Sequence, residues 1–219
     1  MELNRYIDHT LLHSDATPAD IERLCRQAME YNFCGVVVNP VYVSQAVGIL
    51  EGSGVKICSV AGFPLGAGLT EIKIAEAAKA EEHGAAEIDV VANIGWIQSG
   101  RFSDVAGELA ALRRRLAAET ILKVIMETPL VSPEHWPDTV EAVIGSGADF
   151  IKSGTGFFGA VGVEHISTLR RLCAGRIKIK AAGGIRTVAD ALAMIDAGAV
   201  RLGTSASVSI MRDLPASKM

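Results

Sequence analysis

A short run of β-branched and other apolar residues, followed by an amphipathic helical stretch, recurs throughout this chain. The spacing is roughly 25–35 residues, which is typical of βαβ units. Eight runs are expected as strands: Tyr6–Leu11, Cys34–Asn39, Val55–Gly62, Glu87–Ala92, Ile121–Glu127, Asp149–Ser153, Ile177–Ala182 and Val200–Thr204. The stretches between them predict helices over Pro18–Tyr31, Thr70–His83, Ser103–Ala118, Pro133–Ser146, Val163–Leu172 and Thr187–Ala197.

Eight strands that alternate with helices favour a closed parallel barrel, the TIM (β/α)8 architecture, as a single domain over residues 1–219. An open parallel sheet is the alternative. No Gly-x-Gly-x-x-Gly pattern follows the first expected strand, so the sequence gives no sign of a dinucleotide site of the kind that such sheets carry.

Composition excludes several classes of protein. The chain has 219 residues, is 49% hydrophobic and carries a net charge of −4, so a nucleic-acid-binding surface is not expected. The apolar stretches are short and broken by charges, and the first residues do not resemble a signal peptide, so no membrane association is expected either. The four cysteines stand singly, without metal-binding spacing. These features predict a reduced, cytoplasmic protein.

Side chains alternate between the two faces of a strand, and in the later strands the apolar set suits the helix-facing side. This leaves charged residues for the inside of the barrel, where branched aliphatic residues are usual. The inward-facing charged residues are Glu87, Asp89, Lys123, Glu127, Lys152, Lys178, Lys180 and Arg201. We interpret Glu87 and Arg201 as a structural pair near the strand starts, and Lys178 as a residue buried below Lys180 that pairs with Glu87 or Asp89.

Three of these residues indicate chemistry. We expect Asp89, Lys152 and Lys180 near the carboxyl ends of their strands, where barrel enzymes place their active sites. Two lysines on consecutive strands lower each other's pKa, and partial burial adds to the effect. A neutral lysine amine attacks carbonyls and forms a Schiff base, which allows a neighbouring carbon–carbon bond to break. Asp89 is then the group that moves protons. Neither a metal nor another cofactor is expected.

Glycine-rich turns follow the last two strands and precede helices. This is where barrels bind phosphate through backbone N–H groups and a helix N-terminus. The residues concerned are Gly183, Gly184, Gly203 and Ser205, with Ser153, Thr155 and Gly156 after the sixth strand as further donors. The sequence therefore predicts a phosphate-binding site at the mouth.

Several long motifs, in the same order along nearly the whole chain, resemble the 2-deoxyribose-5-phosphate aldolases. They are Asp8-His9-Thr10-Leu11-Leu12, Gly62-Phe63-Pro64-Leu65-Gly66, Glu87-Ile88-Asp89-Val90-Val91-Ala92-Asn93-Ile94-Gly95, Lys123-Val124-Ile125-Met126-Glu127-Thr128, Asp149-Phe150-Ile151-Lys152, Lys180-Ala181-Ala182-Gly183-Gly184-Ile185-Arg186 and Gly203-Thr204-Ser205. The clearest departure is Ser153-Gly154-Thr155-Gly156, where Thr-Ser-Thr-Gly is usual.

The resemblance implies reversible cleavage of 2-deoxy-D-ribose 5-phosphate to D-glyceraldehyde 3-phosphate and acetaldehyde. It implies that Lys152 forms the Schiff base, that Lys180 lowers the pKa of Lys152 and that Asp89 moves protons. We expect Asp8, at the end of the first strand, to orient Lys180, and Lys123 and Glu127 to form a supporting pair. The implied partners are small phosphosugar and aldehyde substrates.

Two other functions remain open. The first is another phosphosugar enzyme on the same fold, such as an isomerase or a lysine-dependent aldolase with a different donor. The paired lysines argue against a simple isomerase, and we see no converging histidines and carboxylates for a metal-dependent epimerase. The second is a sugar-phosphate-binding barrel without activity. A homo-oligomer is expected, with a dimer favoured and with exposed apolar residues such as Trp96 or Trp136 contributing to the interface.

Overall fold

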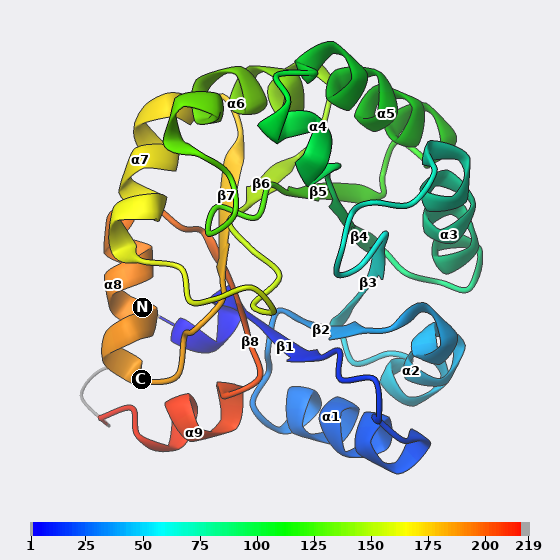
Figure 1. The fold of residues 1–219 in the computed structure, drawn as a ribbon. Coiled ribbons are helices and arrows are strands. Elements are labelled where there is room, and N and C mark those ends of the chain that lie inside the picture. Colours follow the sequence, from blue (N-terminus) through cyan, green and yellow to red (C-terminus); the bar gives the residue numbers. More distant parts are fainter. Residues whose placement is uncertain (1, 216–219) are drawn as a thin grey trace.

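Eight parallel strands close into a barrel in the computed structural model, which describes residues 2–215. Each strand pairs with its neighbours in chain order, and β1 pairs with β8 to complete the ring. The strands are β1 (Ile7–Leu11), β2 (Gly35–Val38), β3 (Lys56–Ala61), β4 (Glu87–Val91), β5 (Ile121–Ile125), β6 (Phe150–Lys152), β7 (Lys178–Ala182) and β8 (Arg201–Thr204). Figure 1 views this ring along its axis, with the helices outside it.

The helices follow the strands around the barrel. They are α1 (Pro18–Glu30), α2 (Val43–Leu50), α3 (Thr70–Glu82), α4 (Ile94–Gln98), α5 (Phe102–Arg115), α6 (Trp136–Gly145), α7 (Val163–Cys173), α8 (Val188–Ala197) and α9 (Ser207–Arg212). Short 3-10 turns cover η1 (Leu3–Tyr6), η2 (Pro40–Tyr42) and η3 (Pro133–His135). The predicted (β/α)8 barrel is confirmed, and the open sheet is excluded.

Local sequence explains several helix ends. Thr17 precedes α1, and its hydroxyl accepts from the backbone N–H of Asp20, whose carboxylate accepts in return from the N–H of Thr17. Thr187 and Asp190 make the same capping box at α8. Each box satisfies backbone donors that the first turn of a helix leaves unpaired.

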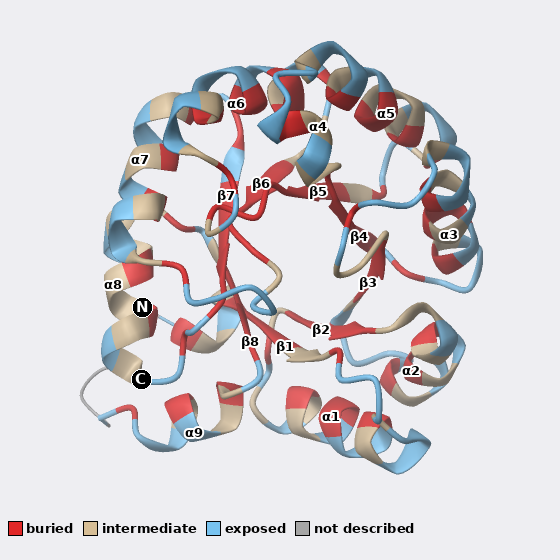
Figure 2. Cartoon of the chain, viewed as in Figure 1, coloured by how far each residue is buried: buried red, intermediate tan, exposed pale blue. Residues whose placement is uncertain are grey.

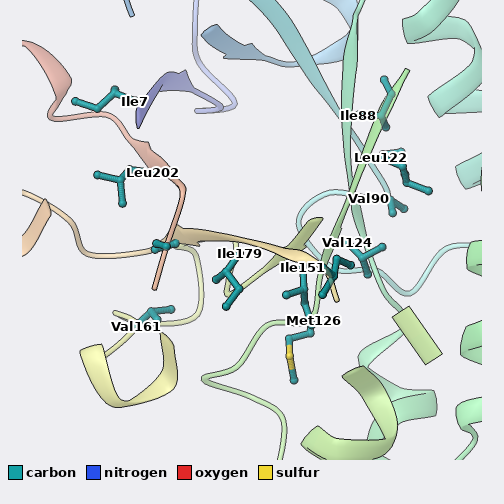
Figure 3. Close-up of a cluster of buried hydrophobic side chains, with 14 of the residues drawn as sticks. Ile7, Ile88, Val90, Leu122, Val124, Met126, Ile151, Val161, Ile179 and Leu202 are labelled. Atoms are coloured by element: carbon teal, nitrogen blue, oxygen red, sulfur yellow. The ribbon is translucent and has the colours of Figure 1, made fainter. Parts of the chain in front are cut away.

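The main apolar core lies between the strands and the helices. Alternate strand residues such as Ile88, Leu122, Val124 and Ile151 point outward into this layer and have no exposed surface. Figure 3 shows these side chains on neighbouring strands, and Figure 2 shows that burial concentrates on the strands and on the inner faces of the helices. This layer stabilises the barrel from outside, which leaves the inside free for other residues.

A second, smaller apolar cluster lies apart from this core. It consists of Leu12, Val37, Cys58 and Val60, with Phe63 packed against it. Its members come from β2, β3 and the segments that follow β1 and β3. One side of the barrel interior is therefore apolar.

Two further findings concern surfaces. Trp136 was expected to be exposed, and this is wrong: it is 4% exposed, and its indole N–H donates to Val131 O at 2.9 Å, because it begins α6 against the core. Trp96 is half-buried and has the Arg101 guanidinium over its ring. Within residues 2–215, every helix is too short or too polar to span a bilayer.

Candidate active site

Charged side chains fill much of the barrel interior. Seven of them, within residues 2–215, form one connected set of ion pairs, which we call the interior network: Asp8, Glu87, Asp89, Lys123, Lys152, Lys180 and Arg201. Arg201 has the most exposed side chain of the seven, at 14%. The network therefore holds four cations and three carboxylates, which leaves one positive charge in excess if every group is ionised.

Asp89 is the centre of this network. Its Oδ1 accepts from Lys123 Nζ at 2.8 Å and from Cys58 Sγ at 3.1 Å. Its Oδ2 accepts from both Lys152 Nζ, at 2.8 Å, and Lys180 Nζ, at 2.9 Å. Two ammonium groups thus share one carboxylate oxygen.

The remaining pairs involve Asp8 and Glu87. Lys180 Nζ is 2.6 Å from Asp8 Oδ2, an ion pair without an aligned hydrogen bond. Arg201 donates to Asp8 Oδ1 at 2.7 Å and to Glu87 Oε2 at 3.2 Å, and the second of these contacts confirms the expected structural pair. Lys123 also contacts Glu87, at 2.6 Å.

Lys152 is the least compensated cation of the network. Lys123, Lys180 and Arg201 each contact two carboxylates, whereas Lys152 contacts Asp89 alone, through the oxygen that Lys180 also uses. Since one cation is in excess, Lys152 is the group that loses its proton at the smallest cost.

The pKa shifts follow this arrangement. Burial lowers the pKa of Lys152 and the charge of Lys180 lowers it further, against the opposing effect of Asp89. Burial also acts to lower the pKa of Lys180, but Asp8 and Asp89 outweigh it and raise that pKa. Burial acts to raise the pKa of Asp89, but three lysines outweigh it and hold that pKa well below its ordinary value. Lys152 is thus the amine that becomes neutral most readily, and Asp89 stays ionised.

A cavity of about 270 Å³ opens onto Lys152 at the carboxyl end of the barrel. Lys152 is the last residue of β6, and it is the one member of the interior network among the residues that line this cavity. Thr155, Gly156, Gly183, Gly184, Gly203 and Ser205, all predicted as phosphate-binding residues, line it too. Ser153 does not line the cavity, because its hydroxyl bridges the amide and carbonyl of Ala182 on β7.

Two glycines in this wall are closely surrounded. A Cβ on Gly203 would lie 3.2 Å from Lys180 Cε, so this glycine leaves room for the lysine stem. Gly184 has a φ of +83°, and a Cβ there would lie 2.7 Å from that of Ala160.

Three residues lie elsewhere in their strands than expected. Asp89 and Lys180 are the middle residues of their strands rather than end residues, and Asp8 is second in β1 rather than last. In a closed barrel the strands are tilted and staggered, so position within a strand does not give depth in the barrel. Lys180 is the register partner of Lys152 on the neighbouring strand and shares Asp89 Oδ2 with it, but its side chain is fully buried and does not line the cavity.

Two expected pairings are wrong. Lys123 pairs with Glu87 and Asp89, not with Glu127, because the chain leaves the extended conformation at Glu127, whose φ is +53°. Lys178 is exposed at the amino-terminal end of β7, where its ammonium lies 5.4 Å from the ring centre of buried Phe150. Arg201 lies 5.7 Å from the same ring.

Several cavity residues were not identified from the sequence. Thr10 and His13 come from the segment around the end of β1, Phe157 from the β6–α7 loop and Arg186 from the β7–α8 loop. Arg186 follows a Gly-Gly turn, so a cation after a glycine-rich phosphate turn was the available signal. Phe157 carried no such signal: it meets Phe63 edge to face, with ring centres 5.2 Å apart, through a contact between distant loops.

Known proteins resemble this chain over nearly its whole length. Residues 3–212 match the DeoC/LacD family aldolases. A deoxyribose-phosphate aldolase of Deinococcus radiodurans is 46% identical over 212 residues, covering 96% of each chain. One from Desulfitobacterium hafniense is 45% identical over 213 residues, covering 96% of this chain and 98% of the other.

Solved structures agree with these relatives. A structure described as QR15, an aldolase, superposes with a TM-score of 0.92 at 38% identity, over 96% of this chain and 95% of that one. The tetrameric deoxyribose phosphate aldolase of Aeropyrum pernix superposes with a TM-score of 0.87 at 35% identity, over 96% and 89% of the two chains. The resemblance seen in the motifs is confirmed, and the chain belongs to the DeoC/LacD family of aldolases.

Proposed function

We propose that this aldolase cleaves 2-deoxy-D-ribose 5-phosphate reversibly to D-glyceraldehyde 3-phosphate and acetaldehyde, through a Schiff base on Lys152. One observation carries the proposal most directly: Lys152 is the least compensated cation of the interior network and faces the cavity. A neutral amine that a carbonyl can reach is what imine formation requires.

The cleavage begins when the Lys152 amine adds to the C1 aldehyde of the open-chain sugar and water leaves, which gives a protonated imine. The C3 hydroxyl then loses its proton, the C2–C3 bond breaks, and its electron pair moves to the imine to give an enamine. Glyceraldehyde 3-phosphate departs. Protonation of the enamine at C2 and addition of water release acetaldehyde and restore the amine.

Asp89 and Lys180 have different roles in these reaction steps. Asp89 contacts Lys152 directly, so it is placed to accept and return protons at the Lys152 nitrogen and, through water, at the substrate. Three lysines return it to the ionised form after each transfer. Lys180 acts by its charge: it lowers the pKa of Lys152 while its own pKa is raised. Asp8 and Lys123 support this arrangement by holding Lys180 and Asp89, respectively.

The cavity is also suited to bind the phosphate. Gly183, Gly184, Gly203 and Ser205 line it, and Arg186 adds a cation. N–H groups in glycine turns and a guanidinium are groups that bind phosphate well.

The test is reductive trapping. The protein is incubated with acetaldehyde and borohydride and analysed by intact and peptide mass spectrometry. We expect a two-carbon adduct on Lys152, absent in Lys152→Ala, together with loss of turnover in that variant. A folded protein with no adduct on any lysine contradicts the Schiff-base proposal, and an adduct on Lys180 reverses the assigned parts of the two lysines.

We further propose that the chain works as a single domain in the cytoplasm, without a metal or cofactor, and as a homo-oligomer, with a dimer favoured. Light scattering coupled to size-exclusion chromatography measures the oligomeric state, and turnover after prolonged chelation measures any need for a metal.

A further inference from the structure

Glu127 is a buried carboxyl group that the proposed reaction leaves unused. It lies two residues beyond the end of β5 and has no exposed surface. Its φ of +53° is in the left-handed region, which residues other than glycine rarely adopt. Such a conformation persists where the surrounding structure fixes it, and it is often found at functional sites.

The carboxylate of Glu127 holds the start of the β6–α7 loop, residues 153–162. Both of its oxygens accept from the backbone N–H of Thr155, at 3.0 and 3.3 Å. Next to this contact, Thr128 N donates to Ser153 O at 2.7 Å. The segment after β5 is thus hydrogen-bonded to the loop through the Glu127 side chain and through its backbone.

Gly154 makes room for this contact. A Cβ on Gly154 would lie 2.9 Å from Glu127 Oε1 and 3.3 Å from Val161 Cγ2. The backbone of Gly154 is not in the left-handed region, so the need for glycine comes from its close neighbours, of which the carboxylate is the nearest. Burial raises the pKa of Glu127, whereas the Thr155 hydrogen bonds and the charge of nearby Lys152 lower it, and the net shift is upward.

The loop held in this way forms part of the cavity wall. Thr155, Gly156 and Phe157 line the cavity together with Gly183 and Gly184. The loop packs on the Gly183–Gly184 turn: Val161 N donates to Gly183 O at 3.0 Å. A Cβ on Gly183 would lie 3.6 Å from Gly156 Cα. The position of the loop therefore sets the width of the cavity at its glycine-rich end. Figure 1 shows the loop, in yellow-green, drawn across the opening of the barrel between β6 and α7.

We propose that Glu127 is a positioning residue that holds the β6–α7 loop against the Gly183–Gly184 turn and thereby sets the preference of the enzyme for a phosphorylated substrate. This inference rests on the proposed function for its substrate. It goes further because it assigns the phosphate preference to a side chain that does not touch the cavity.

The experiment compares two substrates that undergo the same cleavage, 2-deoxyribose 5-phosphate and 2-deoxyribose. The ratio of their kcat/KM values is measured for the wild type, Glu127→Ala, Glu127→Gln, Gly154→Ala and the double variant Glu127→Ala/Gly154→Ala. Gly68→Ala is the matched control, because Gly68 is also a loop glycine without left-handed backbone and a Cβ there meets nothing within 4 Å.

We expect Glu127→Ala to lower the ratio about 10-fold to 100-fold, the worth of one hydrogen bond to a charged group, mostly through the KM of the phosphorylated substrate. Glu127→Gln keeps an oxygen acceptor, so its ratio of kcat/KM values should stay close to that of the wild type. Gly154→Ala lowers the ratio in the wild type but adds little in the Glu127→Ala background, because the carboxylate that it would displace is gone. An equal loss on both substrates, or additive effects of the two substitutions, overturns the proposal.

Hydrogen exchange separates this inference from the proposed function, because it needs no turnover. We expect Glu127→Ala to speed the exchange of the amides in residues 155–162, with no change in the strands. Unchanged exchange overturns the inference even in an active enzyme. Failure of acetaldehyde trapping on Lys152 in the wild type overturns the proposed function and leaves the exchange test valid. If Glu127→Ala does not fold, Gly154→Ala supplies both measurements.

Discussion

Replacement of Lys180 by methionine tests how the interior network prepares Lys152. The substitution keeps most of the side-chain volume and removes one cation. The network then holds three cations and three carboxylates, so no positive charge is in excess. Asp89 Oδ2 is left to Lys152 alone. Both changes favour the protonated form of Lys152.

The size of the effect follows from the geometry. Lys152 Nζ and Lys180 Nζ lie 2.8 and 2.9 Å from the same oxygen, so the two nitrogens are at most as far apart as these distances combined. Two unit charges at a separation of ~5.7 Å, with an effective dielectric constant of ~20, repel by ~3 kcal/mol. This corresponds to ~2 pH units in the pKa of Lys152. In Lys180→Met we therefore expect that pKa to rise by about two units.

The assay follows the rate of borohydride trapping with acetaldehyde as a function of pH, because imine formation depends on the neutral fraction of the amine. We expect the acid limb of the profile to move about two units upward, with trapping near pH 7 slowed ~100-fold and recovered at higher pH. Lys178→Met is the matched control: it removes a lysine from the same strand, at its exposed end. An acid limb that stays in place, or a loss that is equal at every pH, refutes the reasoning.

Four further outcomes are expected. Asp89→Asn leaves three buried lysines without their shared carboxylate, so it should abolish turnover and lower the free energy of unfolding by about 3–5 kcal/mol in chemical denaturation. Leu122→Ala, at a fully buried outward position, should cost about 2–5 kcal/mol in the same measurement while kcat per folded molecule is kept. Gly203→Ala should reduce kcat without unfolding the protein, because the new Cβ presses on the Lys180 stem, and circular dichroism with steady-state kinetics checks both parts. Glu127 has a raised folded-state pKa, so its contribution to stability is present below its unfolded pKa of ~4.3 and is lost as the pH rises through the folded value. Denaturation at a series of pH values should show this loss in the wild type and not in Glu127→Gln.

The strands and the inward direction of the charges were predictable because both depend on local pattern. β-Branched runs give strands, and alternation within a strand assigns its faces whatever the rest of the chain does. Asp89, Lys152 and Lys180 were therefore identified correctly as residues of the barrel interior, and the motifs identified their family.

The depth of a side chain in the barrel and the residues that it contacts were not predictable in the same way. The depth of Lys180 depends on the stagger of eight strands, which no single strand encodes. Alternation also fails where the backbone leaves the extended region. At Glu127 the left-handed turn directs the carboxylate toward Thr155 rather than toward Lys123. The contact of Phe63 with Phe157 joins loops that are distant in the sequence, so neither residue alone predicts it.

The position of Phe150 bears on the route by which substrate enters the active site and products leave it. Its ring is buried at the amino-terminal end of the barrel, with the Lys178 and Arg201 cations both within 6 Å of the ring centre. The cavity that reaches Lys152 opens at the other end. Under the proposed mechanism, both products leave by the mouth through which the sugar entered. The phosphorylated fragment lies between the mouth and the two-carbon fragment on Lys152, so it has to depart first. The reaction is then ordered by the shape of the barrel, and acetaldehyde has to bind first when the enzyme runs toward synthesis.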